Sequence, residues 1–242
     1  MNAVKCMQRY FALERIRNEF TLSKEDCFHI LRVMRLKEDE QVEIVHDGNV
    51  YLCTLKDVNI AVRFVIEKII ERGKDERGMI VVAPFLKETK MNYILQKGTE
   101  MGATEFIFFP AHYGVIKMDE EKLQKRTTRW KKIVKEASEQ SKRTSIPVVR
   151  SIANLQELEG MEGVKFVCST REKKETLKMF LQSQSDCDTL VLVIGPEGGL
   201  DEEEEKQLND MGFTSVSLGA RILRVESVPL FVLSCFNYEF ME

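Results

Sequence analysis

The chain has 242 residues, 43% of them hydrophobic and 31% charged, with a formal net charge of −3. This composition is typical of globular proteins, and the length allows two domains, each with its own core. The acidic balance excludes a protein that grips nucleic acid through overall charge, because phosphate binding depends on lysine and arginine. A nucleic-acid partner would therefore need a local basic surface.

The spacing of cysteines and the lengths of the apolar runs argue against three classes: zinc proteins, disulfide-framework proteins and membrane proteins. The six cysteines show no CxxC spacing and there are three histidines, so neither a zinc site nor a disulfide framework is predicted. The longest apolar runs, 190–194 and 228–236, are too short to span a bilayer. Residues 1–20 lack the apolar core of a signal peptide. We expect no metal, no membrane segment and a cytoplasmic location.

The N-terminal part of the chain has the pattern of short strands. Residues 40–45 and 50–55 alternate between polar and apolar, and Asp47-Gly48 between them is typical of a hairpin turn. One short helix is expected within 24–34. We predict a small, mostly β barrel or sandwich that ends near the polar, glycine-containing stretch 71–78.

From there on, apolar strands alternate with helical patterns. The predicted strands cover 79–85, 106–110, 147–149, 164–168, 189–194 and 216–218. The predicted helices cover 91–101, 123–137, 173–181, 201–211 and 228–238. This alternation predicts a mostly parallel sheet with helices on both faces.

The most informative segment joins a predicted strand to a predicted helix. The strand ends in Gly195-Pro196-Glu197-Gly198-Gly199, and Asp201 with Glu204 has the spacing of a capping box. Such a turn can be purely structural, or it can let the backbone approach a ligand at the strand ends. Neither a dinucleotide fingerprint nor a P-loop is present, and an acidic residue in the turn disfavours a polyphosphate. A neutral or cationic ligand such as a sulfonium fits better.

A second segment, 218–227, again follows a predicted strand. Gly219 marks a turn, and the apolar Ile222 and Leu223 stand between Arg221 and Arg224. The two apolar residues could form the walls of an adenine slot. The alternative is a loop whose arginines are solvated.

Basic and aromatic residues combine in three further segments. Residues 129–143 contain a lysine- and arginine-rich helical pattern that could face phosphates or could be a solvated helix face. Arg9-Tyr10-Phe11 and 29–35 mix aromatic and basic residues as RNA-contact surfaces do. Tyr10 and Phe11 could equally belong to the core, and His29 could be packed and hydrogen-bonded.

Taken together, these segments resemble the 16S ribosomal RNA small-subunit uracil-N3 methyltransferase family of the SPOUT superfamily. The matching segments, in order, are Arg9-Tyr10-Phe11, 29–35, 96–102, Trp130 with 136–143, 195–200 and 218–226. The resemblance covers nearly the whole chain. It implies an α/β fold with a trefoil-knotted SPOUT methyltransferase domain at 73–242 and a small PUA-like β-barrel RNA-binding domain at 1–72.

The same resemblance implies the activity and the partners. The expected reaction is S-adenosylmethionine-dependent methylation of N3 of a specific uridine in 16S ribosomal RNA, by a homodimer that acts on the assembled small subunit. The cofactor-binding residues implied are Ser169, Thr170, Ile194, Gly195, Pro196, Glu197, Gly198, Gly199, Leu218, Gly219, Ile222 and Leu223. The RNA-binding residues implied are Arg9, His29, Arg32, Arg35 and Arg143.

Arg224 and Glu226 are the candidate catalytic residues. An arginine beside the cofactor loop could stabilise negative charge that develops on the uracil oxygens. Glu226 could orient the base or accept its proton, although a carboxylate is a weak base at neutral pH. Two other classes of function stay open: a SPOUT methyltransferase acting on tRNA or on ribose, and a non-catalytic RNA-binding protein.

The chain also departs from the family pattern. The family usually has an arginine and a serine after the strand near residue 110, where this chain has His112-Tyr113-Gly114-Val115. Val225 and Ser227 stand where threonines are common, and Val228-Pro229 stands where small residues are. These departures concern the grip on uracil rather than the cofactor loops.

Overall fold

The computed structural model describes residues 7–57, 62–73, 77–184 and 187–240. The chain divides into two compact units, the first formed by residues 1–75 with 138–145 and the second by residues 76–137 with 146–242. The predicted domain boundary between residues 72 and 73 falls beside 74–76, which lie outside the described residues. That boundary therefore stays a prediction.

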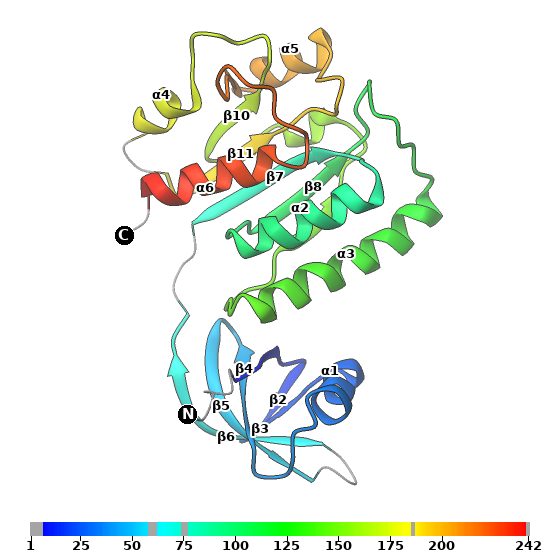
Figure 1. Cartoon of the computed structure of the whole chain (residues 1–242), viewed down its shortest axis with the longest axis vertical. Coiled ribbons are helices and arrows are strands. Elements are labelled where there is room, and N and C mark those ends of the chain that lie inside the picture. The colour runs from blue at the N-terminus through cyan, green and yellow to red at the C-terminus, as the bar shows by residue number, and fades with distance from the viewer. Residues whose placement is uncertain (1–6, 58–61, 74–76, 185–186, 241–242) are drawn as a thin grey trace. The chain divides into compact units, whose positions relative to one another are not determined.

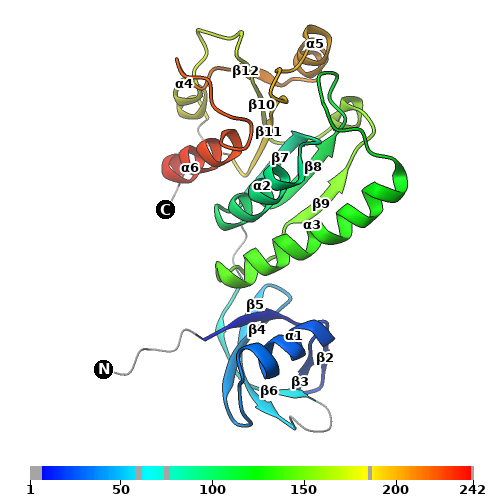
Figure 2. The same cartoon turned by 45° about the vertical axis from the view of Figure 1, so that its right-hand side comes forward.

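The first unit is a curled sheet with one short helical segment (Figure 2). Its strands are β1 (Arg9–Phe11), β2 (Glu14–Ile16), β3 (Glu19–Thr21), β4 (Gln41–His46), β5 (Asn49–Lys56) and β6 (Arg63–Glu71), in the order β1-β4-β5-β6-β3-β2. α1 (Lys24–Phe28) continues into a π-helix, η1 (His29–Val33). Tyr10, Phe20 and Ile30 are buried in its core, so the alternative that placed Tyr10 in the core is confirmed.

The second unit contains a six-stranded sheet in which every pair of neighbours is parallel, as the alternating pattern predicted. Its strands are β7 (Gly78–Pro84), β8 (Glu105–Phe109), β9 (Val148–Ser151), β10 (Val164–Cys168), β11 (Thr189–Val193) and β12 (Thr214–Val216), in the order β12-β10-β11-β7-β8-β9. Because all the pairs are parallel, the carboxyl ends of the six strands lie at one edge of the sheet, which we call the carboxyl edge.

Helices cover both faces of this sheet (Figure 1). One face packs against α2 (Glu88–Glu100), α3 (Glu120–Gln140), α4 (Leu177–Gln182) and α6 (Val228–Phe240). The other face packs against α5 (Glu202–Asp210) and the short 3-10 helix η2 (Leu155–Leu158). Alternate strand residues point to opposite faces, so Phe106 and Phe108 join the first layer, whereas Ile107 and Phe109 join the second.

Two elements differ from the prediction in ways that matter for the site. The helix expected at 173–181 begins at Leu177, because the Glu172 carboxylate accepts hydrogen bonds from the N–H groups of residues 173–175 and holds them in a loop. The strand expected at 216–218 ends at Val216. Among the described residues, no helix is both long and apolar enough to cross a membrane.

Candidate functional site

Three loops at the carboxyl edge are tied together by main-chain and side-chain bonds. The loop after β10 runs beside the end of β12, where the Ser169 N–H donates to the Val216 carbonyl at 2.9 Å and the Ser217 N–H donates to the Glu175 carbonyl at 2.7 Å. Arg171 joins the loop after β10 to the loop after β11 through a 3.1 Å bond to the Leu200 carbonyl. The segments expected to hold one ligand therefore lie close together.

Lys90, in the first turn of α2, connects the loop after β11 with the loop after β12. Its Nζ donates to Glu197 Oε1 at 2.8 Å and lies 3.0 Å from Glu226 Oε2. Lys90 and Glu226 expose 22% and 19% of their side chains, so both are shielded from water more than an ordinary surface pair. One ammonium group thus links the loop after β11, at Glu197, with the end of the loop after β12, at Glu226. The expected proximity of the bends at 195 and 219 themselves stays a prediction.

The charges of this cluster reinforce one another. The hydrogen bond from Lys90 holds the pKa of Glu197 below its ordinary value, and the two carboxylates raise the pKa of Lys90. Burial alone would raise the pKa of Glu226, but its own backbone N–H and Lys90 outweigh burial and lower it. Glu226 is consequently a weaker base than a free glutamate, which favours an orienting role over a proton-accepting one.

The glycines of the loops leave backbone uncovered. Gly199 and Gly219 have φ values of +78° and +104°, a region that favours glycine, and a Cβ at either position would meet no protein atom within 4 Å. Gly195 differs, because a Cβ there would meet the Leu200 nitrogen at 2.7 Å. Gly195 is therefore required for the turn itself, whereas Gly199 and Gly219 present backbone to open space.

The remaining predicted cofactor residues divide by exposure. Ile194 is 1% exposed and Pro196 is buried, so these side chains support the loop rather than face a ligand. Ser169 is also buried, and its hydroxyl accepts a hydrogen bond from the Arg171 N–H at 3.1 Å. Thr170 is exposed, and Glu197 and Gly198 are likewise on the surface.

The predicted adenine walls lie on the loop after β12. Leu218 and Leu223 are half-buried, and Leu218 packs against the core. Ile222 is 87% exposed, so within this chain it is an uncovered apolar side chain rather than part of a closed slot.

The candidate catalytic residues lie where this loop enters α6. Arg224 is exposed, and its carbonyl accepts a hydrogen bond from the Ser227 N–H at 2.8 Å. Val225 between them is buried, which explains an apolar residue at this position of the loop. The arrangement leaves the Arg224 guanidinium on the surface while its backbone is fixed by the turn.

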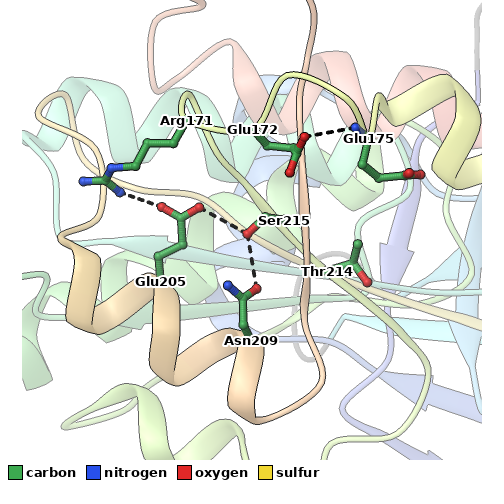
Figure 3. A pocket seen from close by; sticks show the side chains of 7 residues that line it. All are labelled: Arg171, Glu172, Glu175, Glu205, Asn209, Thr214 and Ser215. Atoms are coloured by element: carbon green, nitrogen blue, oxygen red, sulfur yellow. Dashed lines mark hydrogen bonds and ion pairs between the residues drawn. The ribbon is translucent and has the colours of Figure 1, made fainter.

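A pocket of about 550 Å³ lies beside these loops, against α5 and β12 (Figure 3). It is lined by Arg171, Glu172, Glu175, Glu205, Asn209, Thr214 and Ser215. Its polar groups bond mainly to each other: Arg171 pairs with Glu205 at 2.6 Å, and the Ser215 hydroxyl lies 3.1 Å from Glu205 and 3.2 Å from Asn209. The bonds among Arg171, Glu205, Asn209 and Ser215 brace the loop after β10 against α5 and β12.

In the first unit, two of the predicted RNA-binding arginines are buried. Arg9 is 5% exposed and forms ion pairs with Glu43 at 2.8 Å and Glu71 at 3.0 Å. Arg143 is 8% exposed, and its carbonyl accepts a 3.4 Å hydrogen bond from Arg9. A phosphate contact requires an exposed guanidinium, so the structure gives Arg9 and Arg143 a packing role that the sequence pattern did not reveal.

The other three lie on or beside the π-helix. Arg32 and Arg35 are exposed, and Arg35 has a φ of +53°. His29 is half-buried and its Nδ1 lies 3.0 Å from the Tyr10 hydroxyl, which matches the packed alternative for this residue. Phe28, which precedes them, is 62% exposed. Single π-helical turns within helices occur frequently at functional sites.

Two residues of the carboxyl edge escaped the sequence reasoning about site residues. Lys90 was missed because its partner Glu197 is 107 positions away, and no spacing rule predicts such a pair. Tyr113 was noted as a departure from the family pattern without a role. It follows β8, and a Cβ at Gly198 would lie 3.4 Å from the Tyr113 Cβ. A lysine one turn into a helix that follows a buried strand was the available signal for Lys90.

Comparison with known proteins shows the family of the chain. Residues 74–237 match the family described as the RNA methyltransferase domain, and residues 22–66 match the RNA methyltransferase PUA domain. A ribosomal RNA small subunit methyltransferase E of Bacillus subtilis is 34% identical, with 96% of this chain and 97% of that protein covered. The chain belongs to the ribosomal RNA small subunit methyltransferase E family. The Aquifex aeolicus family member is 27% identical, over 94% of this chain and 98% of that protein.

Two solved structures with bound S-adenosylmethionine have a similar fold. A methyltransferase E from Neisseria gonorrhoeae, bound to S-adenosylmethionine, is 25% identical with a TM-score of 0.83, covering 96% of this chain and 97% of that one. A Legionella pneumophila protein described as a methyltransferase, also with bound cofactor, is 26% identical with a TM-score of 0.85 and the same coverage.

Proposed function

We propose that this protein transfers a methyl group from S-adenosylmethionine to N3 of a uridine in 16S ribosomal RNA. The observation that carries the proposal is the joining of the loops after β11 and β12 by Lys90, with uncovered glycine backbone on both loops. Membership of the methyltransferase E family and the cofactor bound in two similar structures support it.

The residues present fit the cofactor. The open space beside Gly199 and Gly219 admits a ligand against backbone N–H and carbonyl groups, as an adenine requires. At the same edge the two carboxylates of Glu197 and Glu226 outnumber the one ammonium of Lys90, and this negative balance suits a ligand with a positive charge. Ser169 and Thr170, residues 194–199, and residues 218, 219, 222 and 223 would hold the cofactor, whose sulfonium supplies an already activated methyl group.

The chain's own residues would then bind and orient the acceptor. Uracil N3 is protonated and normally paired, so the base has to be unstacked before it can reach the carboxyl edge. Arg224, whose guanidinium is exposed on the loop after β12, would stabilise negative charge on the uracil oxygens as the N3 proton leaves to water. Glu226, held by Lys90 with a lowered pKa, would fix this arginine loop rather than take the proton.

The first unit would hold the RNA. His29, Arg32 and Arg35 lie on or beside the π-helix, within the segment that matches the PUA domain. The two exposed arginines, with exposed Phe28 at the end of α1, would form a local basic surface that contacts phosphates. Arg9 and Arg143, being buried, would support this unit rather than contact RNA.

Three further parts of the sequence-based expectation belong to this proposal. A trefoil knot is supported by the way the loop after β10 bonds with the end of β12. A homodimer is supported by the exposed apolar side chains Phe231 and Tyr238 on α6. Domains at 1–72 and 73–242, and action in the cytoplasm on the assembled small subunit, complete it.

The test is a transfer assay with the purified full-length protein. Radiolabelled S-adenosylmethionine and small ribosomal subunits that lack the modification are the substrates, and the nucleosides are identified by mass spectrometry. N3-methyluridine is the expected product. Label in tRNA or in a 2′-O-methyl group would replace the proposal by one of the rival methyltransferases, and RNA binding without cofactor uptake would replace it by a non-catalytic role.

A further inference from the structure

Tyr113 is an exposed aromatic side chain at the carboxyl edge. It follows β8, and 52% of it is exposed. An exposed ring contributes less to the free energy of folding than a buried one. Val115, on the same loop, and Ile222, on the loop after β12, are 80% and 87% exposed at this edge. Apolar surface that is left uncovered beside a proposed binding site has the character of a contact surface.

The loop that carries Tyr113 is fixed at both ends. Ala111 packs against the hydrophobic layer on one face of the sheet and Ile116 against the layer on the other. The His112 N–H donates to Glu204 Oε1 at 2.8 Å, and Glu204 is itself held in the capping box at the start of α5. Tyr113 is therefore presented by a defined turn and is not a freely moving surface residue.

Its position is set against the loop after β11. A Cβ at Gly198 would lie 3.4 Å from the Tyr113 Cβ and 3.7 Å from its Cγ, which are van der Waals distances, so the tyrosine lies beside this glycine. The His112 ring packs edge-on at 5.0 Å between centroids, with planes at 80°. These two contacts fix the Tyr113 ring beside the bend that is proposed to hold the cofactor.

We propose that Tyr113 is the stacking platform for the unstacked target uracil. This inference rests on the proposed function and adds the residue that holds the base. A flat ring with an accessible face binds a single base by stacking, and unstacked bases in RNA are commonly held on aromatic side chains. The ring lies against the loop after β11, so a base on it would be next to the segment that holds the methyl donor.

The experiment compares three variants of the full-length protein in the transfer assay. Tyr113→Ala and Tyr113→Leu, which lack a π face, should raise the KM for small subunits roughly 10-fold, while Tyr113→Phe keeps it. The affinity for S-adenosylmethionine, by calorimetry, and the melting temperature should stay at wild-type values. Tyr93→Ala is the matched control, because Tyr93 is a tyrosine on α2 with a similar exposure, 45%, and has no assigned role.

The outcomes separate this inference from the function on which it rests. If wild-type protein incorporates no methyl group, the proposed function fails whatever Tyr113 does. If the wild type is active and Tyr113→Leu keeps its KM, or Tyr113→Phe loses as much as Tyr113→Ala, the stacking role is overturned. A loss of cofactor affinity that accompanies every variant would make Tyr113 a structural part of the loop instead.

Discussion

The two edges of the parallel sheet use the same residue type in opposite ways. At the amino edge, where the strands begin, two glycines lie against another strand: a Cβ at Gly163 would meet the Thr189 carbonyl at 2.5 Å, and one at Gly78 would meet the Thr189 hydroxyl at 2.7 Å. At the carboxyl edge, Gly199 and Gly219 face open space. Gly163 and Gly78 serve packing, as Gly195 does at the carboxyl edge, whereas Gly199 and Gly219 leave backbone available to a ligand.

The edges differ in charge as well. The loops of the carboxyl edge are held by ion pairs between distant segments, above all Lys90 with Glu197 and Glu226. The side chains of an ion pair can also bond to a ligand or change rotamer when it binds, whereas a closely packed backbone contact cannot. We infer that the groups named at the carboxyl edge serve binding and that the packed glycines of the amino edge serve stability. Substitutions test each of these two statements.

The largest effect is expected at Arg224. Arg224→Ala removes the guanidinium proposed to stabilise charge on the uracil, and the loss of one such group lowers kcat roughly 100-fold. Cofactor affinity should not change. Arg221→Ala is the control, since Arg221 is exposed on the same loop and has no assigned role. Equal turnover of Arg224→Ala and wild type would remove Arg224 from the mechanism.

Gly163→Ala tests the amino edge. Gly163 has a φ of +108° and its missing side chain faces backbone, so we expect a loss of about 2 kcal/mol in the free energy of unfolding, measured by denaturant titration. Gly160→Ala is the matched control, because Gly160 has a φ of +79° but open space around it. Its loss should be smaller. If Gly163→Ala weakened cofactor binding without a change in stability, the division of roles between the edges would be wrong.

Lys90→Met tests how the carboxyl edge is held together. Without the ammonium group, two carboxylates face each other without a shared partner, and S-adenosylmethionine affinity should fall roughly 10-fold by calorimetry. Lys90→Arg, which keeps the positive charge, should retain part of the affinity for S-adenosylmethionine. Lys97→Met, on the same helix and paired locally with Glu100 at 2.8 Å, should leave the affinity unchanged. An unaltered dissociation constant for Lys90→Met would show that the two loops need no such tie.

The smallest effect is expected from pH, which should leave the contribution of Lys90 to cofactor affinity unchanged near neutrality. The pKa values of Glu197 and Glu226 lie below 4.5. The two charged carboxylates therefore contribute to cofactor affinity above pH 4.5, and this contribution is lost as the pH falls through the lowered pKa values. The pKa of Lys90 lies above 10.5. The charged ammonium therefore contributes to cofactor affinity below pH 10.5, and this contribution is lost as the pH rises through the raised pKa value. The ratio of the Lys90→Met and wild-type cofactor affinities should therefore be constant between about pH 6 and pH 9. A ratio that changes across that range would mean that another group titrates at the site.

The sequence predicted the strands of the sheet well, because runs such as 189–194 are apolar, short and bounded by polar residues. It predicted poorly where side chains override local propensity. The charged run at 171–175 has a helical pattern, yet Glu172 bonds to the N–H groups that follow and delays α4 until Thr176 caps it. Lys90 and the burial of Arg9 depend on contacts between distant segments, which no local pattern reveals.

The central claim is that one S-adenosylmethionine binds at the carboxyl edge, against the loops after β11 and β12. Hydrogen–deuterium exchange of the full-length protein with and without the cofactor tests it most directly. The account predicts slower exchange in peptides that contain 195–200 and 217–225, with no change at 160–165. Unchanged exchange in both loops under saturating cofactor, or protection at 160–165 instead, would contradict it.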